Sequence, residues 1–343
     1  MCLVTYSWKE SDSLEKVRAY RGRPTWANVE LTEFCNFDCK WCYAAKNRSS
    51  QGRRSRIHMP IRDASRLIKI FSESGIREIT CSGGEPLMYP HIRQFIKEAT
   101  DCGIIVHMNT NGYFFTKKLA RELHDLGLTQ IQTNIDSLNP RNHDAIRGKT
   151  GSFVRSVSAL KNARNVGMSA VCETVITKQS IGEISDIMKF ARMVLGVQKC
   201  RVWDATPSGA VLGDMDMVPE RYPEIIKAVT KIAEKLGAKG ILSYEPFFPD
   251  IATKLKVTQV GCPVRMGMLV HILPNGDVPY CVTARNHLMY NVFDFDSICD
   301  VHAEMIKKFN EREFGGSYGC ASRMISNHMD DYQEPCLSRG HGS

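Results

Sequence analysis

Three cysteines with metal-ligand spacing stand near the start of the chain, in the run CNFDCKWC that contains Cys35, Cys39 and Cys42. Three thiolates on one short loop can converge on one metal centre. A structural zinc ion usually takes four ligands from paired motifs, and the next cysteine along the chain is Cys81. A [4Fe–4S] cluster normally takes four cysteines, so three would leave one iron open to a ligand that is not protein. The spacing favours such a cluster, with a structural zinc as the alternative.

Polar and glycine-rich motifs follow the next predicted strands. They are the run CSGGEP from Cys81, the run NTNG from Asn109 and the run NIDS from Asn134. Glycines lack Cβ and let the backbone approach a ligand closely, and a glutamate adds negative charge near a bound ammonium group. The residues of interest in these motifs are Gly83, Gly84, Glu85, Asn111, Asn134 and Asp136.

Alternating apolar runs and amphipathic segments from Trp26 to about Gly240 predict successive βα units. The predicted strands are Trp26–Leu31, Glu78–Cys81, Ile104–Met108, Gln130–Ile135, Ala170–Ile176 and Lys199–Trp203. The predicted helices are Ile61–Ser74, His91–Asp101, Thr116–Leu126, Phe153–Asn165, Ile184–Leu195 and Pro223–Leu236. Such an alternation predicts an α/β fold.

Six βα units with right-handed crossovers predict a parallel sheet that curls into a partial (β/α)6 barrel of the TIM type. In such barrels the active site lies on the loops after the carboxyl ends of the strands. The cysteine triplet, GGEP, NTNG and Asp136 follow the first four predicted strands in turn. We therefore expect them to meet at one end of the barrel.

The cysteine triplet with an aromatic residue before its last cysteine, followed by GGEP, resembles the radical S-adenosylmethionine (radical SAM) superfamily. The resemblance implies that the amino and carboxylate groups of S-adenosylmethionine chelate the open iron of the cluster. An electron, from a donor such as a flavodoxin or ferredoxin, then breaks the sulfonium C–S bond, and the resulting 5′-deoxyadenosyl radical abstracts a substrate hydrogen. It also implies that Gly83–Glu85 hold the methionine amino group, that Tyr43 meets the adenine, and that Asn111, Asn134 and Asp136 line the ribose and methionine portions.

A second group of cysteines lies beyond Gly261, where the βα rhythm stops. Residues 268–272 and 278–282 flank an Asn-Gly turn and predict a β-hairpin. Cys262 and Cys281 bracket it, and their spacing around Gly276 resembles SPASM and twitch extensions, although a full SPASM domain has more cysteines. The resemblance implies one auxiliary iron–sulfur cluster, and the alternative is ordinary buried thiols. Its expected ligands are Cys262, Cys281, Cys320 and Cys336, with Cys299 a weaker candidate.

The composition bounds the class of protein. The chain has 343 residues, of which 43% are hydrophobic, and this composition excludes wholesale disorder. Its net charge of +8 indicates only a mild preference for anionic partners. Thirteen cysteines without a visible secretion signal or transmembrane segment favour a cytoplasmic protein with metal-bound or free thiols. We expect an N-terminal extension (1–25), a barrel (26–245), a small auxiliary-cluster domain with the hairpin (246–338) and a tail (339–343).

The substrate is less well marked. The resemblance favours radical chemistry on a peptide or small metabolite, with Glu173, Arg201 and Asp204 as candidate catalytic residues on the fifth and sixth strands. One alternative is a large anionic substrate, RNA or lipid, recruited by the basic loop that holds Arg48, Arg53, Arg54 and Arg56. Another is a non-catalytic iron–sulfur or zinc protein, although an electron carrier gains nothing from an open iron.

Overall fold

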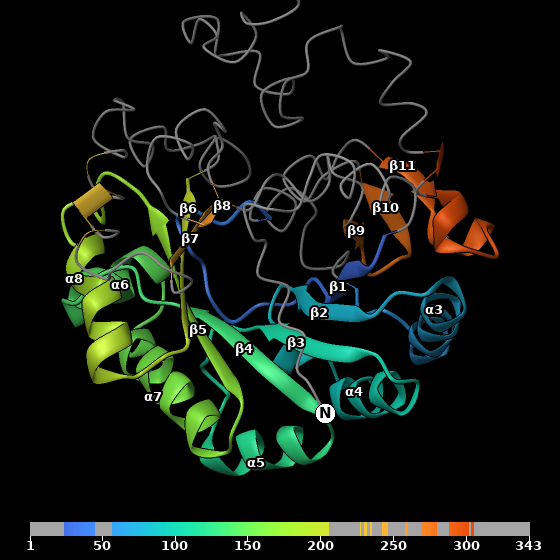
Figure 1. Ribbon diagram of the computed structural model, residues 1–343, viewed down its shortest axis with the longest axis horizontal. Coiled ribbons are helices and arrows are strands. Elements are labelled where there is room, and N and C mark those ends of the chain that lie inside the picture. The colour runs from blue at the N-terminus through green and yellow to red at the C-terminus, as the bar shows by residue number, and fades with distance from the viewer. Residues whose placement is uncertain are drawn as a thin grey trace, which may run out of the picture.

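The computed structural model describes residues 24–44, 57–205, 269–279 and 288–301, with isolated positions between 227 and 259 and at 303–304. Its main feature is a curled parallel sheet, whose described strands follow the order β8-β7-β6-β5-β4-β3-β2-β1-β9 (Figure 1). The strands are β1 (Trp26–Thr32), β2 (Glu78–Gly83), β3 (Ile105–Asn109), β4 (Leu128–Asn134), β5 (Ser169–Ile176), β6 (Lys199–Asp204), β7 (Leu242–Glu245), β8 (Thr258–Gln259) and β9 (Leu269–Ile272). The predicted partial α/β barrel is confirmed.

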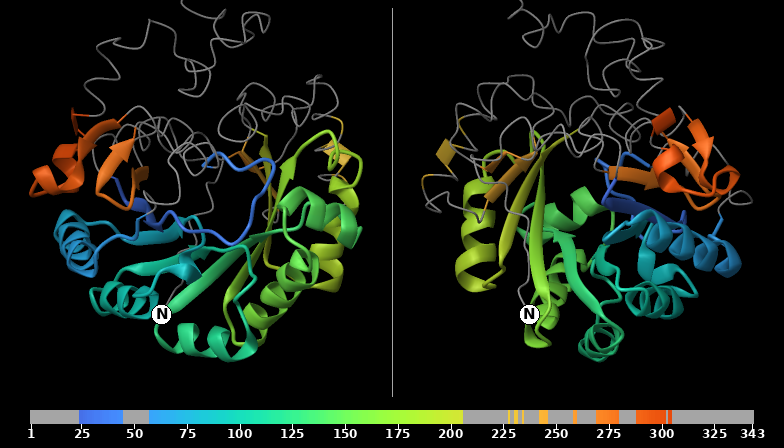
Figure 2. Two further views of the ribbon diagram at one scale, coloured as in Figure 1. Left: turned by 180° about the vertical axis from the view of Figure 1, so that it is seen from behind. Right: turned by 45° about the vertical axis from the view of Figure 1, so that its right-hand side comes forward.

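The described helices cover the convex side of this sheet, as both views in Figure 2 show. They are α3 (Ile61–Ser74), α4 (Ile92–Asp101), α5 (Lys117–Asp125), α6 (Pro140–Arg147), α7 (Ser152–Asn165) and α8 (Ile184–Lys189), which continues as a π-helical turn over Phe190–Val194. Five of these match predicted helices to within one or two residues at most ends, because the residues that each helix buries recur at helical spacing. The predicted helix Pro223–Leu236 falls largely outside the described residues.

The two faces of the sheet differ in polarity. On β1, Ala27, Val29 and Leu31 are fully buried in the apolar core together with residues of the covering helices. The alternate residues Asn28 and Glu30 point to the concave side, because successive side chains of a strand alternate between faces. Their partners in register on β2 are Thr80 and Ser82. The concave wall is therefore polar. The interior of a closed barrel, in contrast, is filled by branched apolar side chains.

Helix α6 is an element that the apolar pattern does not predict. Its start is fixed by Asn139, whose Oδ1 accepts a hydrogen bond from the Arg141 N–H at 2.9 Å, and by Pro140 in the first turn. It ends at Gly148, which takes a left-handed conformation with φ 62°. The helix is short and polar, so its caps rather than its periodicity mark it in the sequence.

The strands after residue 268 pair differently from the predicted hairpin of 268–272 with 278–282. The Asn-Gly turn is present, but β9 joins the main sheet parallel to β1, with Asn28 opposite His271. Strand β10 (Asp277–Pro279) instead pairs antiparallel with β11 (Leu288–Asn291). The prediction that β9 pairs with the strand after the turn was wrong. A turn motif fixes a reversal of chain direction but does not determine which strand lies alongside. No helix in the described part of the chain has the length and apolar character to cross a membrane.

Candidate functional site

The three clustered cysteines lie on the loop that follows β1. Cys39 is buried and Cys35 and Cys42 are half-buried, and none of the three forms a disulfide. The Cys42 N–H donates to the Cys39 carbonyl at 3.1 Å, which turns the loop back on itself. Burial raises the pKa of the Cys39 thiol to about 12; Arg147 opposes this shift, while Cys42 and Cys35 add to it. The three thiols therefore interact electrostatically. No three His, Cys, Asp or Glu side chains in the described regions lie close enough together to hold a metal ion as they stand.

The two glycines of GGEP join the end of β2 to the start of the cysteine loop. The Gly84 N–H donates to the Thr32 carbonyl, and the Glu85 N–H donates to the Phe34 carbonyl, each at 2.7 Å. A Cβ atom on Gly83 would collide with the carbonyl oxygen of Thr32, and one on Gly84 with that of Phe34. The close approach that these glycines permit is to the chain's own backbone. The approach of these glycines to a ligand, expected from the sequence, stays a prediction.

Glu85 is 1% exposed and uses both carboxylate oxygens within the protein. Its Oε1 accepts from Thr110 Oγ1 at 2.6 Å and from the Leu87 N–H at 3.1 Å, and its Oε2 accepts from the Asn111 N–H at 2.7 Å. Burial raises the pKa of this carboxyl, and the bonds from Thr110 and Asn111 oppose the shift. Glu85 therefore ties the end of β3 to the end of β2, and its role beside a bound ammonium group stays a prediction.

Asn111 brings the NTNG motif against the cysteine loop. Its side-chain Nδ2 donates to Asn36 Oδ1 at 2.8 Å and lies 3.9 Å from the Cys35 sulfur. Its Oδ1 accepts from the Tyr113 N–H at 2.9 Å, so the amide is oriented from both sides. The predicted proximity of this motif to the triplet is thus present in the structure.

Asp136 forms a buried ion pair with Arg147, a residue that the sequence analysis did not single out. Arg147 Nη1 lies 3.5 Å from Asp136 Oδ2, and their side chains are 3% and 1% exposed. The same carboxylate accepts from Trp41 Nε1 at 3.2 Å. The Arg147 guanidinium lies 4.8 Å from the Trp41 ring centroid and 5.4 Å from that of Phe37, both on the cysteine loop.

The charge around Arg147 fits an anionic centre on the cysteine loop. Burial alone would lower the pKa of this guanidinium, but Cys39, Asp136, Cys35 and Cys42 together raise it. A buried cation needs nearby negative charge, and Asp136 supplies only one carboxylate. The three cysteines on the adjacent loop are ligands of the kind that an iron–sulfur cluster takes, and their deprotonated thiols would supply the remaining charge. In the chemistry of their donor atoms and in charge, the residues present therefore fit such a cluster.

Helix α6 carries a second residue that the sequence analysis missed, His143. Its Nδ1 accepts from the Asp136 N–H at 3.1 Å, and its ring packs edge-on against Phe153 with centroids 5.6 Å apart. Burial lowers the pKa of His143 to about 3, and Arg147 adds to that shift, so the ring is neutral. The Asn-Pro start and the Gly end of α6 were the signals that could have located both residues.

The candidate catalytic residues Glu173 and Arg201 lie side by side on β5 and β6, next to Asn134 of β4 in register. Arg201 Nη1 donates to Gln132 Oε1 at 2.6 Å and to Glu173 Oε1 at 3.2 Å. Burial raises the pKa of Glu173, and Arg201 opposes this. Of the other candidates, Tyr43 is half-buried directly after Cys42, and only the backbone of Asp204 is described. The auxiliary ligands Cys262, Cys281, Cys320 and Cys336 and the basic loop of Arg48, Arg53, Arg54 and Arg56 lie outside the described residues.

Comparison with protein families gives a match of residues 29–191 to the Radical SAM superfamily. Among curated proteins, the AdoMet-dependent heme synthase of Methanosarcina barkeri is 27% identical over 197 residues, which are 57% of this chain and 55% of that protein. The probable GTP 3′,8-cyclase of Sulfurisphaera tokodaii is 28% identical over 213 residues, 62% of this chain and 64% of that one. The match to the heme synthase thus spans little more than half of that protein.

Solved structures show the same fold. The crystal structure of Streptococcus suis SuiB bound to S-adenosylmethionine superimposes with a TM-score of 0.66 at 18% identity, covering 88% of this chain and 71% of that one. The structure of SuiB bound to the precursor peptide SuiA gives a TM-score of 0.65 at 19% identity, with 84% and 67% covered.

Proposed function

The chain belongs to the radical SAM superfamily through residues 29–191, and from this membership we propose that it is an enzyme that cleaves S-adenosylmethionine reductively and acts on a C–H bond of its substrate. The observation that carries the proposal is the set of three cysteines, none of them in a disulfide, beside a buried arginine at the carboxyl end of a parallel barrel. Cys35, Cys39 and Cys42 would hold a [4Fe–4S] cluster. When bound, the cluster and S-adenosylmethionine supply one-electron cleavage of a C–S bond and a radical able to remove a hydrogen atom.

The chain's own residues would hold and shield that centre. Arg147 places a fixed positive charge beside the thiols, and Asp136 with Trp41 keeps its guanidinium in place. Phe37 and Trp41 cover the guanidinium and keep water away from it. The Asn111 amide, oriented by Asn36 and Tyr113, is positioned to donate toward the Cys35 sulfur.

S-adenosylmethionine would lie at the ends of the strands that follow. We assign its contacts to Tyr43, Asn111, Asn134, Asp136 and the segment Gly83–Glu85. That segment also fixes the ends of β1, β2 and β3 through its backbone. Glu85 supports this assignment indirectly, because its hydrogen bonds to Thr110 and Asn111 set where the β3 end lies.

The substrate would be a peptide or small metabolite with polar groups that match the concave wall. Arg201 and Glu173 offer a cation and a buried carboxyl side by side within β6 and β5. Arg201 could bind a substrate carboxylate or phosphate by exchanging its bond to Gln132, while Glu173 could hold or accept a proton. Replacing Arg201 by Lys should therefore raise KM more than it lowers kcat, because Lys keeps the charge but loses the planar donor pair.

An auxiliary cluster on Cys262, Cys281, Cys320 and Cys336 is part of the proposal. It is supported by the cysteine spacing around Gly276. Cys262→Ala should lower the iron content by about four atoms per chain relative to the wild type. Unchanged iron would remove the auxiliary cluster from the proposal and leave the first cluster untouched.

The decisive experiment measures iron content and 5′-deoxyadenosine release on anaerobically loaded protein with dithionite and S-adenosylmethionine. The test variant is Cys42→Ala, and the matched control is Cys102→Ala, which removes an exposed thiol at the end of α4. We expect loss of 5′-deoxyadenosine in the first and wild-type rates in the second. Zinc in place of iron with no release, or full release from Cys42→Ala, would contradict the proposal.

A further inference from the structure

An exposed basic surface with an aromatic centre lies directly beside the cysteine loop. We call it the rim patch and define it by Tyr113, Phe114, Lys118, Lys149 and Arg155. The side-chain cations of Lys149 and Arg155 each lie 5.2 Å from the Tyr113 ring centroid. Phe114, 38% exposed, packs edge-on against Tyr113 with centroids 5.3 Å apart. The rim patch therefore combines positive charge with exposed aromatic surface.

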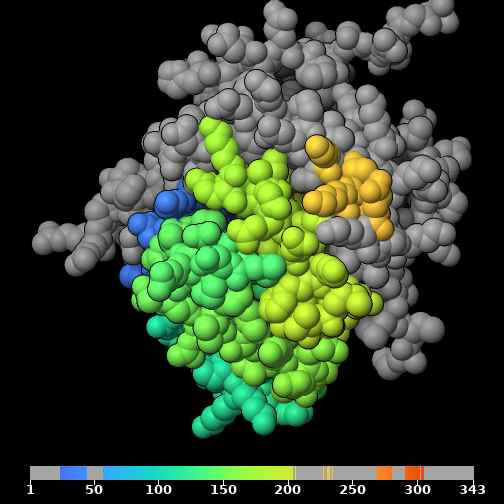
Figure 3. Space-filling view, turned by 90° about the vertical axis from the view of Figure 1, so that its left-hand side faces the viewer, coloured from blue at the N-terminus to red at the C-terminus, as the bar shows by residue number. Residues whose placement is uncertain are grey.

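The rim patch is joined to the cysteine loop by packing. The Lys40 N–H donates to the Ile146 carbonyl at 3.0 Å, which holds the loop against the end of α6 just before Lys149. A Cβ atom on Gly148 would collide with the Asp38 carbonyl oxygen, so the two backbones touch. Figure 3 shows this side of the molecule, where the blue residues 24–44 border the green surface that α6 and α7 form.

An aromatic contact leads from the rim patch to the inside of the loop. The Tyr113 ring meets the Phe37 ring edge-on, with centroids 5.9 Å apart. Phe37 is 5% exposed and stands in the sequence between Cys35 and Cys39. The surface tyrosine is therefore one ring away from the segment that bears the thiols.

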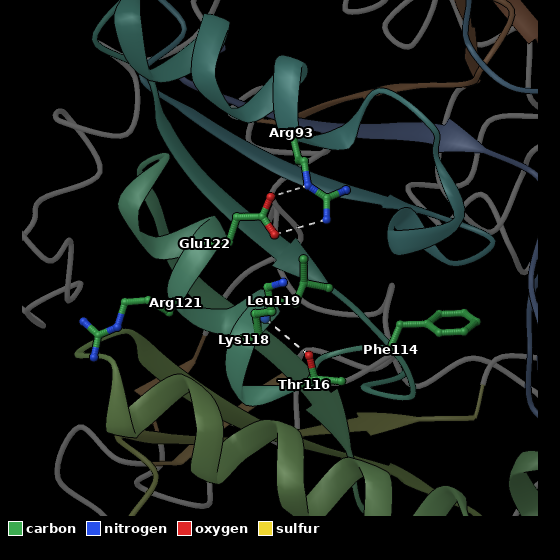
Figure 4. Close-up of a pocket in the computed structure, with 7 residues that line it drawn as sticks. All are labelled: Arg93, Phe114, Thr116, Lys118, Leu119, Arg121 and Glu122. Carbon is green, nitrogen blue, oxygen red and sulfur yellow. Dashed lines mark hydrogen bonds and ion pairs between the residues drawn. The ribbon is translucent and has the colours of Figure 1, made fainter.

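The positive surface extends from the rim patch around the start of α5. An open hollow of about 630 Å³ there is lined by Arg93, Lys118, Arg121 and Phe114, among others (Figure 4). Phe114 lies at one end of it and Arg121 at the other. Glu122 pairs with Arg93 at 2.5 Å, which leaves the positive charge of Lys118 and Arg121 in excess. Two acids lie near the rim patch. Asp38, whose backbone touches Gly148, is exposed, and Asp144 accepts hydrogen bonds from Gly151, Ser152 and Phe153.

From this arrangement we infer that the rim patch is the docking surface for an acidic one-electron carrier protein, which delivers the electron that the cysteine centre requires. The inference rests on the proposed function, because only a redox centre on the loop calls for a donor. Transient electron-transfer complexes bury little area and depend on complementary charge, which suits a small patch with an aromatic centre and a basic border. Electron transfer weakens steeply with distance, and the carrier would dock where one ring separates it from the loop.

The test uses anaerobically iron-loaded protein and a reduced acidic flavodoxin, with cluster bleaching and flavodoxin binding as readouts. The variant is the pair Lys149→Glu and Arg155→Glu, and the control is Lys161→Glu, an exposed lysine further along α7. We expect the pair to slow bleaching by flavodoxin at least ten-fold at low salt and to flatten its salt dependence. Binding of oxidised flavodoxin should weaken by a similar factor, and the control should stay within two-fold of the wild type.

Dithionite separates this inference from the proposed function. Because it is a small reductant that needs no docking, it should bleach the cluster and drive 5′-deoxyadenosine release equally in wild type and variants. The docking surface is overturned if flavodoxin bleaches the cluster of the double variant at the wild-type rate, or if Lys161→Glu slows bleaching equally. In either case, 5′-deoxyadenosine release with dithionite would still support the proposed function. If dithionite yields no 5′-deoxyadenosine from the wild type, the proposed function fails. In that case, weaker flavodoxin binding by the double variant would still support the docking surface. Equal flavodoxin binding by the wild type and the double variant would overturn it.

Discussion

Arg147 and Asp136 form an ion pair from which water is almost completely excluded, with Nη1 and Oδ2 3.5 Å apart directly behind the cysteine loop. Asp136 follows β4 and Arg147 ends α6. Because Trp41 of the cysteine loop donates to Asp136, the pair connects the loop to both elements. The arrangement of the loop therefore depends on side chains that lie far from it in sequence.

Removing one member of this pair should be costly. We expect Arg147→Met to lower the free energy of unfolding by about 3–5 kcal/mol, because it leaves the Asp136 carboxylate buried without its cation. Urea denaturation of the metal-free protein measures this. Arg121→Met, at an exposed position of α5, should stay within about 0.5 kcal/mol. Adding Asp136→Asn to Arg147→Met should recover part of the loss, and a strictly additive double variant would argue against coupling.

Gly148 sets how closely α6 approaches the loop. Gly148 and Gly151 have φ values of 62° and 79°, so alanine strains both, but only at Gly148 would the new Cβ meet the loop, at the Asp38 carbonyl. We expect Gly148→Ala to reduce the iron retained after anaerobic loading at least two-fold, and Gly151→Ala to retain wild-type iron with a loss of about 1 kcal/mol in stability. Equal iron contents in the two variants would contradict this.

His143 should make stability fall in mild acid. Its folded-state pKa is lowered from 6.5 to about 3, so between these values the unfolded chain binds a proton that the folded chain does not. The free energy of unfolding then falls as the pH falls, by up to about 1.4 kcal/mol per pH unit.

The matched variant for this measurement is His143→Asn, whose Oδ1 can replace Nδ1 as the acceptor for the Asp136 N–H. Chemical denaturation from pH 8 to 4 should give curves for wild type and variant that run parallel above pH 7 and converge or cross below pH 6. Parallel curves throughout would show that His143 titrates normally in the folded protein.

A second buried pair attaches β9 to the barrel. His271 Nε2 lies 2.9 Å from Glu30 Oε1, and both side chains are at most 2% exposed. His271→Leu should destabilise the fold by about 3 kcal/mol, because the Glu30 carboxylate loses this partner. The double variant with Glu30→Gln should lose less than the sum of the single variants, as thermal or urea unfolding would measure. Independent, additive effects would mean that the pair contributes no coupling.

The strands and most helices follow from the sequence because their apolar periodicity is a local property. Helix α3, predicted over Ile61–Ser74, has those bounds in the structure. Helix α6 has only His143, Ile146 and Arg147 buried, so periodicity could not reveal it. Its caps, Asn139 and Gly148, were visible but are weak signals when they stand alone.

The positions of the site residues could be predicted, but their partners could not. The order of motifs after successive strands places Cys35, Asn111 and Asp136 at one end of a barrel. Whether Gly84 approaches a ligand or the Phe34 carbonyl depends on tertiary packing. The same holds for β9, since no local pattern around the Asn-Gly turn specifies a partner more than two hundred residues away.

The parallel pairing of β9 with β1 has a consequence for synthesis of the protein on the ribosome. Strand β1 can pair with β2 as soon as residue 83 has emerged, but its other edge waits for residues 269–272. Until then the nascent chain carries an open strand edge next to the cysteine loop, and open edges invite association with other chains. Completion of the barrel at β1 is thus a late event, and a chain terminated before β9 would leave that edge permanently unpaired.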